Sequence, residues 1–493
     1  MKKAFDWVDR DLLFFKLLNY NITGKIYWAI KSMYTNTQSC IQLQLIFTDW
    51  FSVLNGVKQG DNLSPSLFAL YINDLVHELN SLGYGIRVGT YVINILLYAD
   101  DIVLVAENEN ILQKLLDQLY EWYSRWHLEI NESKSNIMHF RKARKPRSNT
   151  EFKIGNIKLN YVQTYRYLGV TLDENLTFNV ASQELTDAGG RAFGGIVAKF
   201  KEFKHLSFKC FTKLFDTGVE PICTYASSIW GFNKFQLGQK LQLKAIRYFL
   251  GVHKYTPILA LTADFGWLEM KYKHNLNILK FYNRLLSMNN DRLTRQAFEA
   301  DLSQITSFNW SGTVKQILHD IGREGNIENF EKIDISYATE KFKELTNREF
   351  QENVEVKPKL RSYKLFKKHV ETERYVTANL SKYERSLMAK LRSGTLQLAI
   401  ETGRFRNIEI ENRLCILCNQ NQVENEIHFL CFCPFYHDLR QKLYRELNID
   451  PESFENNNDL FVEVMCSEKI YCLCSFIVNA WGKRKDFIYN SDS

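Results

Sequence analysis

Hydrophobic and polar residues alternate along the chain in two patterns, and the change from one to the other lies near residue 175. Short runs of apolar and β-branched residues, typical of strands, lie at 91–97, 102–105, 152–157 and 165–172. Apolar residues at helical spacing lie at 64–79, where Ser64 before Pro65 is the expected N-cap, and at 111–126. Beyond residue 175 helical spacing dominates, over 191–250, 257–289 and 312–400. The pattern predicts a mixed α+β region followed by mostly helical ones.

Two carboxylates interrupt the strand pattern. Asp100 and Asp101 lie between two apolar runs, which predicts a hairpin with both acids at its turn. Adjacent carboxylates repel each other, and a fold tolerates them where a cation offsets their charge. Two Mg²⁺ ions held by carboxylates can activate an attacking hydroxyl and stabilise the leaving oxygen in phosphoryl transfer. For an isolated Asp-Asp pair a solvated turn is the alternative, because Asp is a favoured turn residue.

Length and charge allow several folded domains and a polyanionic partner. The chain has 493 residues, 45% of them hydrophobic, which exceeds one ordinary domain. Lys and Arg number 63 against 56 Asp and Glu, a formal net charge of +7. Two stretches, 134–147 and 357–368, are rich in Lys and Arg and hold no acid. Such runs are commonly solvated, but beside Tyr363, Phe366 and Tyr375 we expect contacts to RNA phosphates and bases.

The cysteines are unevenly distributed and indicate a metal site. The first residues lack the apolar core of a signal peptide, and no apolar run of about 18 residues predicts a membrane span. Without a secretory signal, a Cys-x-x-Cys pair indicates metal binding before a disulfide, and we expect an intracellular protein of the nucleus or cytoplasm. The residue types and spacing of a structural zinc site occur in Cys415, Cys418, His428 and Cys433. Cys431 is an alternative fourth ligand, and a set of buried free thiols is the alternative to zinc.

Four segments carry a resemblance to a known family. They read KAFDWVDRDLL (3–13), GVKQGDNLSPSLFALYINDL (56–75), YADD (98–101) and YRYLGV (165–170). In this order and spacing they resemble the reverse transcriptase of non-LTR (LINE-type) retrotransposons, strongly over 1–175 and more loosely beyond. The resemblance implies a right-hand polymerase with a palm built on an antiparallel sheet. The implied regions are a palm with residual fingers at 1–175, a thumb-like helical region at 176–255, a helical connector at 256–405 and a zinc-binding region at 406–493.

The resemblance also implies roles for the matching residues. The implied catalytic residues are Asp100 and Asp101, which would bind Mg²⁺, and Lys134, which would lie near the leaving pyrophosphate. The implied substrate-binding residues are Phe5, Gln59, Gly60 and Tyr98. The implied primer grip is formed by Tyr167, Leu168 and Gly169. The implied partners are an RNA template, a DNA primer and dNTPs. The family pattern also places the last zinc-binding cysteine directly before a proline, which favours Cys433 over Cys431 as the fourth ligand.

One departure from the family pattern bears on activity. The pattern Asp-x-Lys-Lys-Ala-Phe-Asp matches from Lys2 onward with Met1 at the variable position, so its first Asp falls one position before Met1. We therefore expect an N-terminally truncated piece of a longer element protein, with an endonuclease possible upstream in the parent, and little polymerase activity from this chain alone. The alternatives are a non-catalytic nucleic-acid-binding remnant and a decayed product without function. The zinc segment argues against a group II intron maturase.

Overall fold

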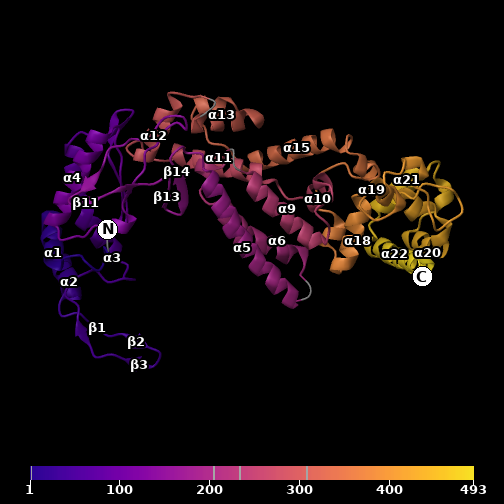
Figure 1. Cartoon of the computed structure of the whole chain (residues 1–493), viewed down its shortest axis with the longest axis horizontal. Helices are drawn as coiled ribbons and strands as arrows, with labels where there is room; N and C mark the ends of the chain where they lie inside the picture. Colours follow the sequence, from indigo (N-terminus) through magenta and orange to yellow (C-terminus); the bar gives the residue numbers. More distant parts are fainter. Residues whose placement is uncertain (2, 204–205, 233–234, 307–308, 493) are drawn as a thin grey trace. The chain divides into compact units, whose positions relative to one another are not determined.

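The computed structural model describes residues 1, 3–203, 206–232, 235–306 and 309–492. Lys2, where the family pattern begins to match, lies outside the described residues, as do 204–205 and 233–234 of the predicted helical range 191–250. The chain forms two compact units (Figure 1). Unit 1 comprises Met1–Thr177 and Met288–Ile305, and unit 2 comprises Phe178–Ser287 and Thr306–Ser493. The finer division into four regions stays a prediction.

Unit 1 mixes helices with short strands (Figure 1). Its helices are α1 (Arg10–Asn19), α2 (Gly24–Tyr34), α3 (Ser64–Ser81), α4 (Glu109–Arg125), the 3₁₀ turn η1 (Glu132–Lys134) and α12 (Leu293–Leu302). Its strands are β1 (Gln38–Ser39), β2 (Gln42–Leu43), β3 (Ile46–Phe47), β4 (Phe51–Ser52), β5 (Ile86–Val88), β6 (Tyr91–Ile93), β7 (Ile95–Tyr98), β8 (Asp101–Leu104), β9 (Asn136–Ile137), β10 (Lys153–Ile154), β11 (Ile157–Lys158), β12 (Asn160–Tyr161), β13 (Thr164–Tyr167) and β14 (Val170–Asp173). The predicted mixture of helix and strand in this part is confirmed.

The strands of unit 1 pair in twos. Every sheet that the described residues form has two strands, and most pairs are antiparallel hairpins between neighbours in sequence. β9 and β12 pair in parallel instead. A continuous antiparallel palm sheet is therefore not formed by the described strands, in contrast to the expectation. Strands of two to four residues gain little from long-range pairing, whereas a hairpin closes with the smallest loop-entropy cost.

The core of unit 1 lies between α1, α3 and α4. Leu13, Leu75 and Trp122, one from each helix, are fully buried. Lys16 of α1 is also buried, where its Nζ lies 3.4 Å from the centre of the Trp126 ring and donates to Asp74 of α3 at 2.7 Å. Burial lowers the pKa of Lys16 to about 8. Cation–π contacts and one ion pair thus replace the hydration that this ammonium loses.

The start of α3 differs from the prediction. The helix begins at Ser64, but Leu63 is the N-cap and no side chain caps the helix. Asp61 Oδ1 accepts from the Leu63 amide at 3.1 Å. Ser64 is instead buried with its Oγ 3.4 Å from the Tyr34 hydroxyl, so the Ser64 N-cap prediction is wrong. A serine that faces the core cannot turn back onto its own helix end.

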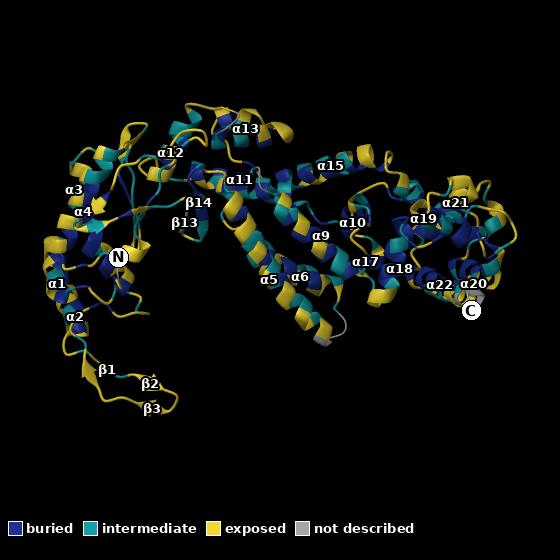
Figure 2. Cartoon of the chain, viewed as in Figure 1, coloured by how far each residue is buried: buried dark blue, intermediate teal, exposed yellow. Residues whose placement is uncertain are grey.

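A hairpin formed by β1–β4 projects from unit 1 with its apolar side chains exposed (Figure 2). Leu43, Leu45 and Phe47 are 75%, 91% and 60% exposed. This hairpin therefore adds little to the buried core of unit 1, and its stability depends on its own strand pairing.

The described residues of unit 2 form helices joined by loops, with an isolated β-bridge between Leu414 and Val423 (Figure 1). Its longer helices are α5 (Asn179–Phe203), α6 (Phe208–Gly218), α9 (Gln236–Leu250), α10 (Ile258–Phe265), α11 (Met270–Leu286), α13 (Trp310–Asp320), α15 (Ile335–Val354), α18 (Lys382–Arg392), α19 (Ala399–Phe405), α20 (His437–Leu447), α21 (Asn457–Cys466) and α22 (Ile470–Asp492). Its short helices are α7 (Glu220–Cys223), α8 (Ser227–Trp230), α14 (Gly325–Glu328), α16 (Tyr363–Phe366), α17 (Arg374–Thr377), η2 (Pro358–Leu360), η3 (Ile410–Asn412), η4 (His428–Phe432), η5 (Pro434–Tyr436) and η6 (Pro451–Ser453). One hydrophobic cluster extends from Phe193 to Trp481. Among the described residues, no helix is long and apolar enough to cross a bilayer.

A charged network is buried in unit 2. Arg392 donates from Nε and Nη2 to the two carboxylate oxygens of Asp264 at 2.9 and 3.0 Å. Tyr363 and Tyr375 donate their hydroxyls to the same carboxylate at 2.8 and 2.9 Å. Burial alone would raise the pKa of Asp264, but the charge and hydrogen bonds of Arg392 lower it overall. Both tyrosines are fully buried, so the prediction that they stack on RNA bases is wrong.

The basic run 357–368 is neutralised by acids from elsewhere in the chain. Lys359 pairs with Glu401 at 2.8 Å, and the buried Lys367 pairs with Glu373. Arg361 likewise pairs with a buried glutamate. The run contains no acid of its own, but in the folded chain glutamates from other segments pair with its cations. Those cations are therefore not free to bind phosphate. In the other run the same is true of Arg141 and Arg147, which both pair with Glu174.

Candidate active site and metal centre

The two adjacent carboxylates lie at the tip of a hairpin, as predicted. β7 and β8 pair antiparallel from Ile95↔Leu104 to Tyr98↔Asp101, leaving Ala99 and Asp100 as the turn. Ala99 has φ of 50°, a left-handed conformation that costs a non-glycine residue free energy. Tyr98 and Asp101 are exposed and Asp100 is half-buried. Both carboxylates are thus held by backbone pairing in a place that a hydrated cation can reach.

Charged groups from distant segments surround this tip. The Met1 amino nitrogen lies 3.3 Å from the Asp100 carbonyl oxygen and donates to it. Burial lowers the pKa of this amine, Asp100 and Asp101 raise it, and Lys134 lowers it, so all three side chains act on one point. Asp100 and Asp101 share the hairpin tip, and the charge of Lys134 acts on the same amine. A carboxylate pair beside a lysine has the groups to hold a divalent cation and to neutralise a phosphate.

The predicted primer grip contains a tight hairpin turn near the carboxylates. Leu168 and Gly169 join β13 to β14 with φ of 46° and 82°, as a two-residue turn with two positive φ angles requires. Burial raises the pKa of Tyr167, and the charge of Asp101 adds to this effect. Tyr165 of the same strand donates its hydroxyl to the Lys134 carbonyl oxygen at 3.2 Å. The hairpin is thereby hydrogen-bonded to the backbone of Lys134.

Phe5 and Gln59 form a second group in unit 1. The Phe5 ring stacks on Phe68 of α3, with ring centres 4.8 Å apart and planes at 20°. Gln59 Nε2 donates to Asp6 Oδ1 at 2.8 Å. Gly56, at φ of +86°, lies so close to the chain that a Cβ there would come 2.9 Å from the carbonyl oxygens of Phe5 and Asp6. Asp6 is a contact that sequence reasoning missed, although its place in the family pattern was a signal. Gly60 is exposed with φ of +84°, beside Gln59.

The four predicted zinc ligands converge in unit 2. Their ligand atoms all lie within 4.8 Å of one another in the cluster Cys415, Cys418, His428 and Cys433. The sulfurs of Cys415 and Cys433 are 3.8 Å apart, and Cys418 Sγ is 3.5 Å from His428 Nε2. In a tetrahedral site with zinc–sulfur bonds of about 2.3 Å, ligand atoms lie about 3.5 to 3.8 Å apart. The pairs Cys415–Cys433 and Cys418–His428 are therefore at the separations of a tetrahedral site.

The structure distinguishes Cys433 from Cys431. Cys431 is outside the cluster, in apolar surroundings that raise the pKa of its thiol to about 12. Its carbonyl oxygen accepts from the Tyr444 hydroxyl at 3.3 Å. Arg440 of α20 donates to the carbonyl oxygens of Leu430 and Cys433 at 2.9 and 2.7 Å. This arginine, which no motif marked, holds the loop that presents Cys433.

Comparison with known proteins decides what the first unit is. Residues 1–172 match the family described as reverse transcriptase (RNA-dependent DNA polymerase). Residues 1–172 are a reverse transcriptase domain. Curated relatives of the chain include the RNA-directed DNA polymerase from mobile element jockey of Drosophila melanogaster, 24% identical over 60% of the chain and 32% of the relative.

Two further relatives of the chain are also named as proteins of mobile elements. The Pol polyprotein from type-1 retrotransposable element R2 of Nasonia vitripennis is 29% identical over 34% of the chain and 17% of its own length. The probable RNA-directed DNA polymerase from transposon X-element of Drosophila melanogaster is 24% identical over 58% of the chain and 31% of its own length. The resemblance to non-LTR retrotransposon enzymes is confirmed. The chain spans about a third or less of the length of these relatives.

Proposed function

We propose that the chain contributes the metal-dependent catalytic hairpin of an RNA-directed DNA polymerase from a non-LTR retrotransposon. The observation that carries this proposal is the hairpin tip that bears Asp100 and Asp101, in a segment that matches the reverse transcriptase family. Asp100 and Asp101 would hold Mg²⁺, which lowers the barrier to attack of a primer 3′-hydroxyl on a dNTP. Lys134 would donate to the phosphate that leaves.

The other predicted residues take supporting roles in this proposal. Phe5 would close the sugar pocket, and Gln59 and Gly60 would contact the nucleotide and template. Tyr98 would contact substrate from the exposed end of β7, while the turn of Leu168 and Gly169 would grip the primer beside Tyr167. Unit 2 would supply the thumb-like and connector regions, and a structural zinc ion on the Cys₃His cluster would stabilise its last region.

A direct test adds one aspartate before Met1. Because the Met1 nitrogen lies 3.3 Å from the Asp100 carbonyl oxygen, an added residue is bonded beside the two carboxylates. We expect the Asp-extended chain to give at least tenfold more primer extension on an RNA template with Mg²⁺ than the chain itself, because a third carboxylate beside Asp100 and Asp101 adds a ligand for the metal. The matched control adds Asn instead. Equal activity of the Asp and Asn forms would count against the proposal.

Metal binding by the chain as it stands supplies a test without turnover. We expect Asp101→Asn to weaken Mn²⁺ binding at least tenfold, measured by electron paramagnetic resonance, because an amide lacks the negative charge that holds the ion. Asp117→Asn on α4 is the matched control, since Asp117 bonds Gln113 in an exposed place. If both variants bind Mn²⁺ as the unchanged chain does, Asp101 is not a ligand.

A non-catalytic nucleic-acid-binding role is the second candidate. It is favoured by the exposed cations that stay unpaired in unit 2, such as Lys244 and Lys382. Salt-dependent RNA binding is expected under both functions, so only primer extension separates them.

A further inference from the structure

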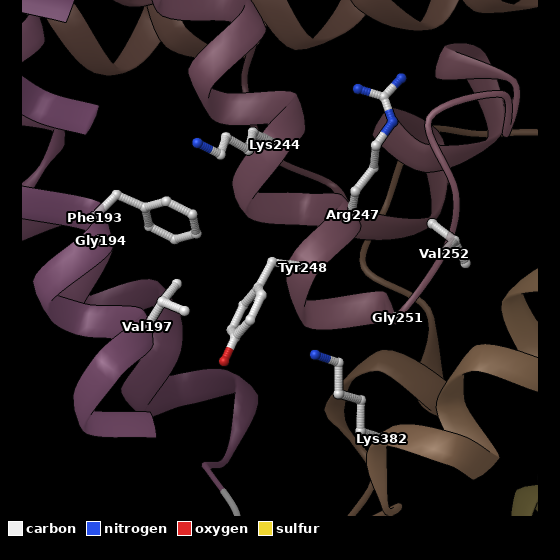
Figure 3. A pocket seen from close by; sticks show the side chains of 9 residues that line it. All are labelled: Phe193, Gly194, Val197, Lys244, Arg247, Tyr248, Gly251, Val252 and Lys382. Carbon is white, nitrogen blue, oxygen red and sulfur yellow. The ribbon is translucent and has the colours of Figure 1, made fainter. Parts of the chain in front are cut away.

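A pocket of unit 2 is lined by cations that have no acidic partner. It has a volume of about 500 Å³ and lies between α5, α9 and α18 (Figure 3). Its lining residues are Phe193, Gly194, Val197, Lys244, Arg247, Tyr248, Gly251, Val252 and Lys382. No acidic residue in the described part of the chain forms an ion pair with Lys244, Arg247 or Lys382. The basic run 357–368, by contrast, is largely neutralised.

The surroundings of these cations make an anion the complementary ligand. Burial lowers the pKa of Lys382, and the like charges of Arg385 and Lys201 lower it further. Burial likewise lowers the pKa of Arg247, whose Nε is buried with no hydrogen-bond partner among the described residues. The Lys382 ammonium lies 4.0 Å from the centre of the Tyr248 ring (Figure 3). Lys382 and Arg247 thus lose part of their hydration without an acidic partner, while Lys244 beside them is exposed. One bound anion would pair with all three cations.

Three of the four glycines of α5, Gly190, Gly194 and Gly195, have no atom within 4 Å of the place a Cβ would take. A glycine inside a helix costs about 0.5–1 kcal/mol relative to alanine. At Gly189 the cost is explained, because a Cβ there would come 2.3 Å from Cys223 Sγ. At Gly194 and Gly195 a Cβ would meet nothing within 4 Å, and Gly194 lines the pocket. Open space at Gly194 lets a ligand approach the helix backbone closely.

We propose that this pocket binds one phosphodiester group of a single-stranded nucleic acid. Lys244, Arg247 and Lys382 would pair with the phosphate, and the sugar would lie against Gly194 and Val197. The inference goes beyond the proposed function, because it places a strand contact in unit 2 without any residue of the catalytic hairpin. A free phosphate compound shares the chemistry of the phosphodiester, so the test includes both.

The test measures binding of a fluorescent single-stranded RNA to the whole chain in EDTA, where no chemistry occurs. We expect Lys244→Gln/Lys382→Gln to weaken binding about tenfold and to reduce the slope of log affinity against log salt by about 1.4. Lys209→Gln/Lys213→Gln is the matched control, because both lysines are exposed on α6 and outside the pocket. Equal losses in the two double variants would overturn the proposal.

Filling the pocket provides an independent variant that should not unfold the chain. Gly194→Leu and Gly195→Leu both improve helix propensity, so the thermal midpoint should hold or rise in each. We expect Gly194→Leu to weaken RNA binding about tenfold and Gly195→Leu to leave it unchanged, since only Gly194 lines the pocket. Equal affinity of both variants would overturn the site. If an equimolar amount of inorganic pyrophosphate displaces all of the RNA, the pocket binds free phosphate compounds, and the proposal that its ligand is a nucleic-acid strand is contradicted. The RNA-binding measurements are made in EDTA, so they test the pocket even if the chain shows no primer extension.

Discussion

Loss of zinc should unfold the last region of unit 2. Cys415 and Cys433 are buried with their sulfurs 3.8 Å apart, and no disulfide joins them. Structural zinc stabilises isolated zinc fingers by about 10–16 kcal/mol, and here we expect a loss of several kcal/mol because α20–α22 add their own core. Treatment with a strong chelator should therefore lower the thermal midpoint and raise hydrogen exchange in 406–492.

Single substitutions separate the ligands from a neighbouring thiol. We expect Cys433→Ser to release the ion in native mass spectrometry and to reproduce the effect of chelation. Cys431→Ala is the matched control, because Cys431 is equally buried but lies outside the cluster. It should keep one zinc ion per chain. The zinc site would be contradicted if the unchanged chain is folded but contains no zinc. It would also be contradicted if Cys431→Ala loses the ion while Cys433→Ser keeps it.

Replacement of Arg392 should cost unit 2 about 3–5 kcal/mol of unfolding free energy, because it leaves a buried carboxylate without its cation. Arg392 and Asp264 are both almost completely buried, and Arg392 also lies 3.0 Å from Glu373. In Arg392→Met the Asp264 carboxylate would keep only the hydroxyls of Tyr363 and Tyr375. Urea unfolding followed by circular dichroism measures the difference.

The same substitution at an exposed pair provides the comparison. Arg374 pairs with Glu468 at 2.5 Å, but the two side chains are 57% and 83% exposed. Water already solvates both charges, so Arg374→Met should cost less than about 1 kcal/mol. Asp264→Leu combined with Arg392→Met should recover part of the stability, since no unpaired charge then stays buried. A similar cost for Arg374→Met and Arg392→Met would contradict this account.

Local sequence signals predicted the parts whose geometry is local. The hairpin at Asp100 follows from two apolar runs separated by a turn. The strand expected over 165–172 is instead a hairpin, because Leu168 and Gly169 form a turn within it. The spacing of Cys415, Cys418, His428 and Cys433 indicated the cluster that the structure assembles. Helix periodicity likewise located α3 and α4. The predicted N-cap of α3 was wrong, because the Ser64 hydroxyl contacts the Tyr34 hydroxyl, which is distant in sequence.

The sequence by itself determined the family, the acidic hairpin and the ligand spacing, because each is written in residues close together in the chain. Only the tertiary structure decided which charges are free. Lys359 and Lys367 meet Glu401 and Glu373 on folding, whereas Lys244 and Lys382 meet no acid among the described residues. Charge compensation acts through space with an energy that depends on distance and burial, so the composition of a run cannot reveal it.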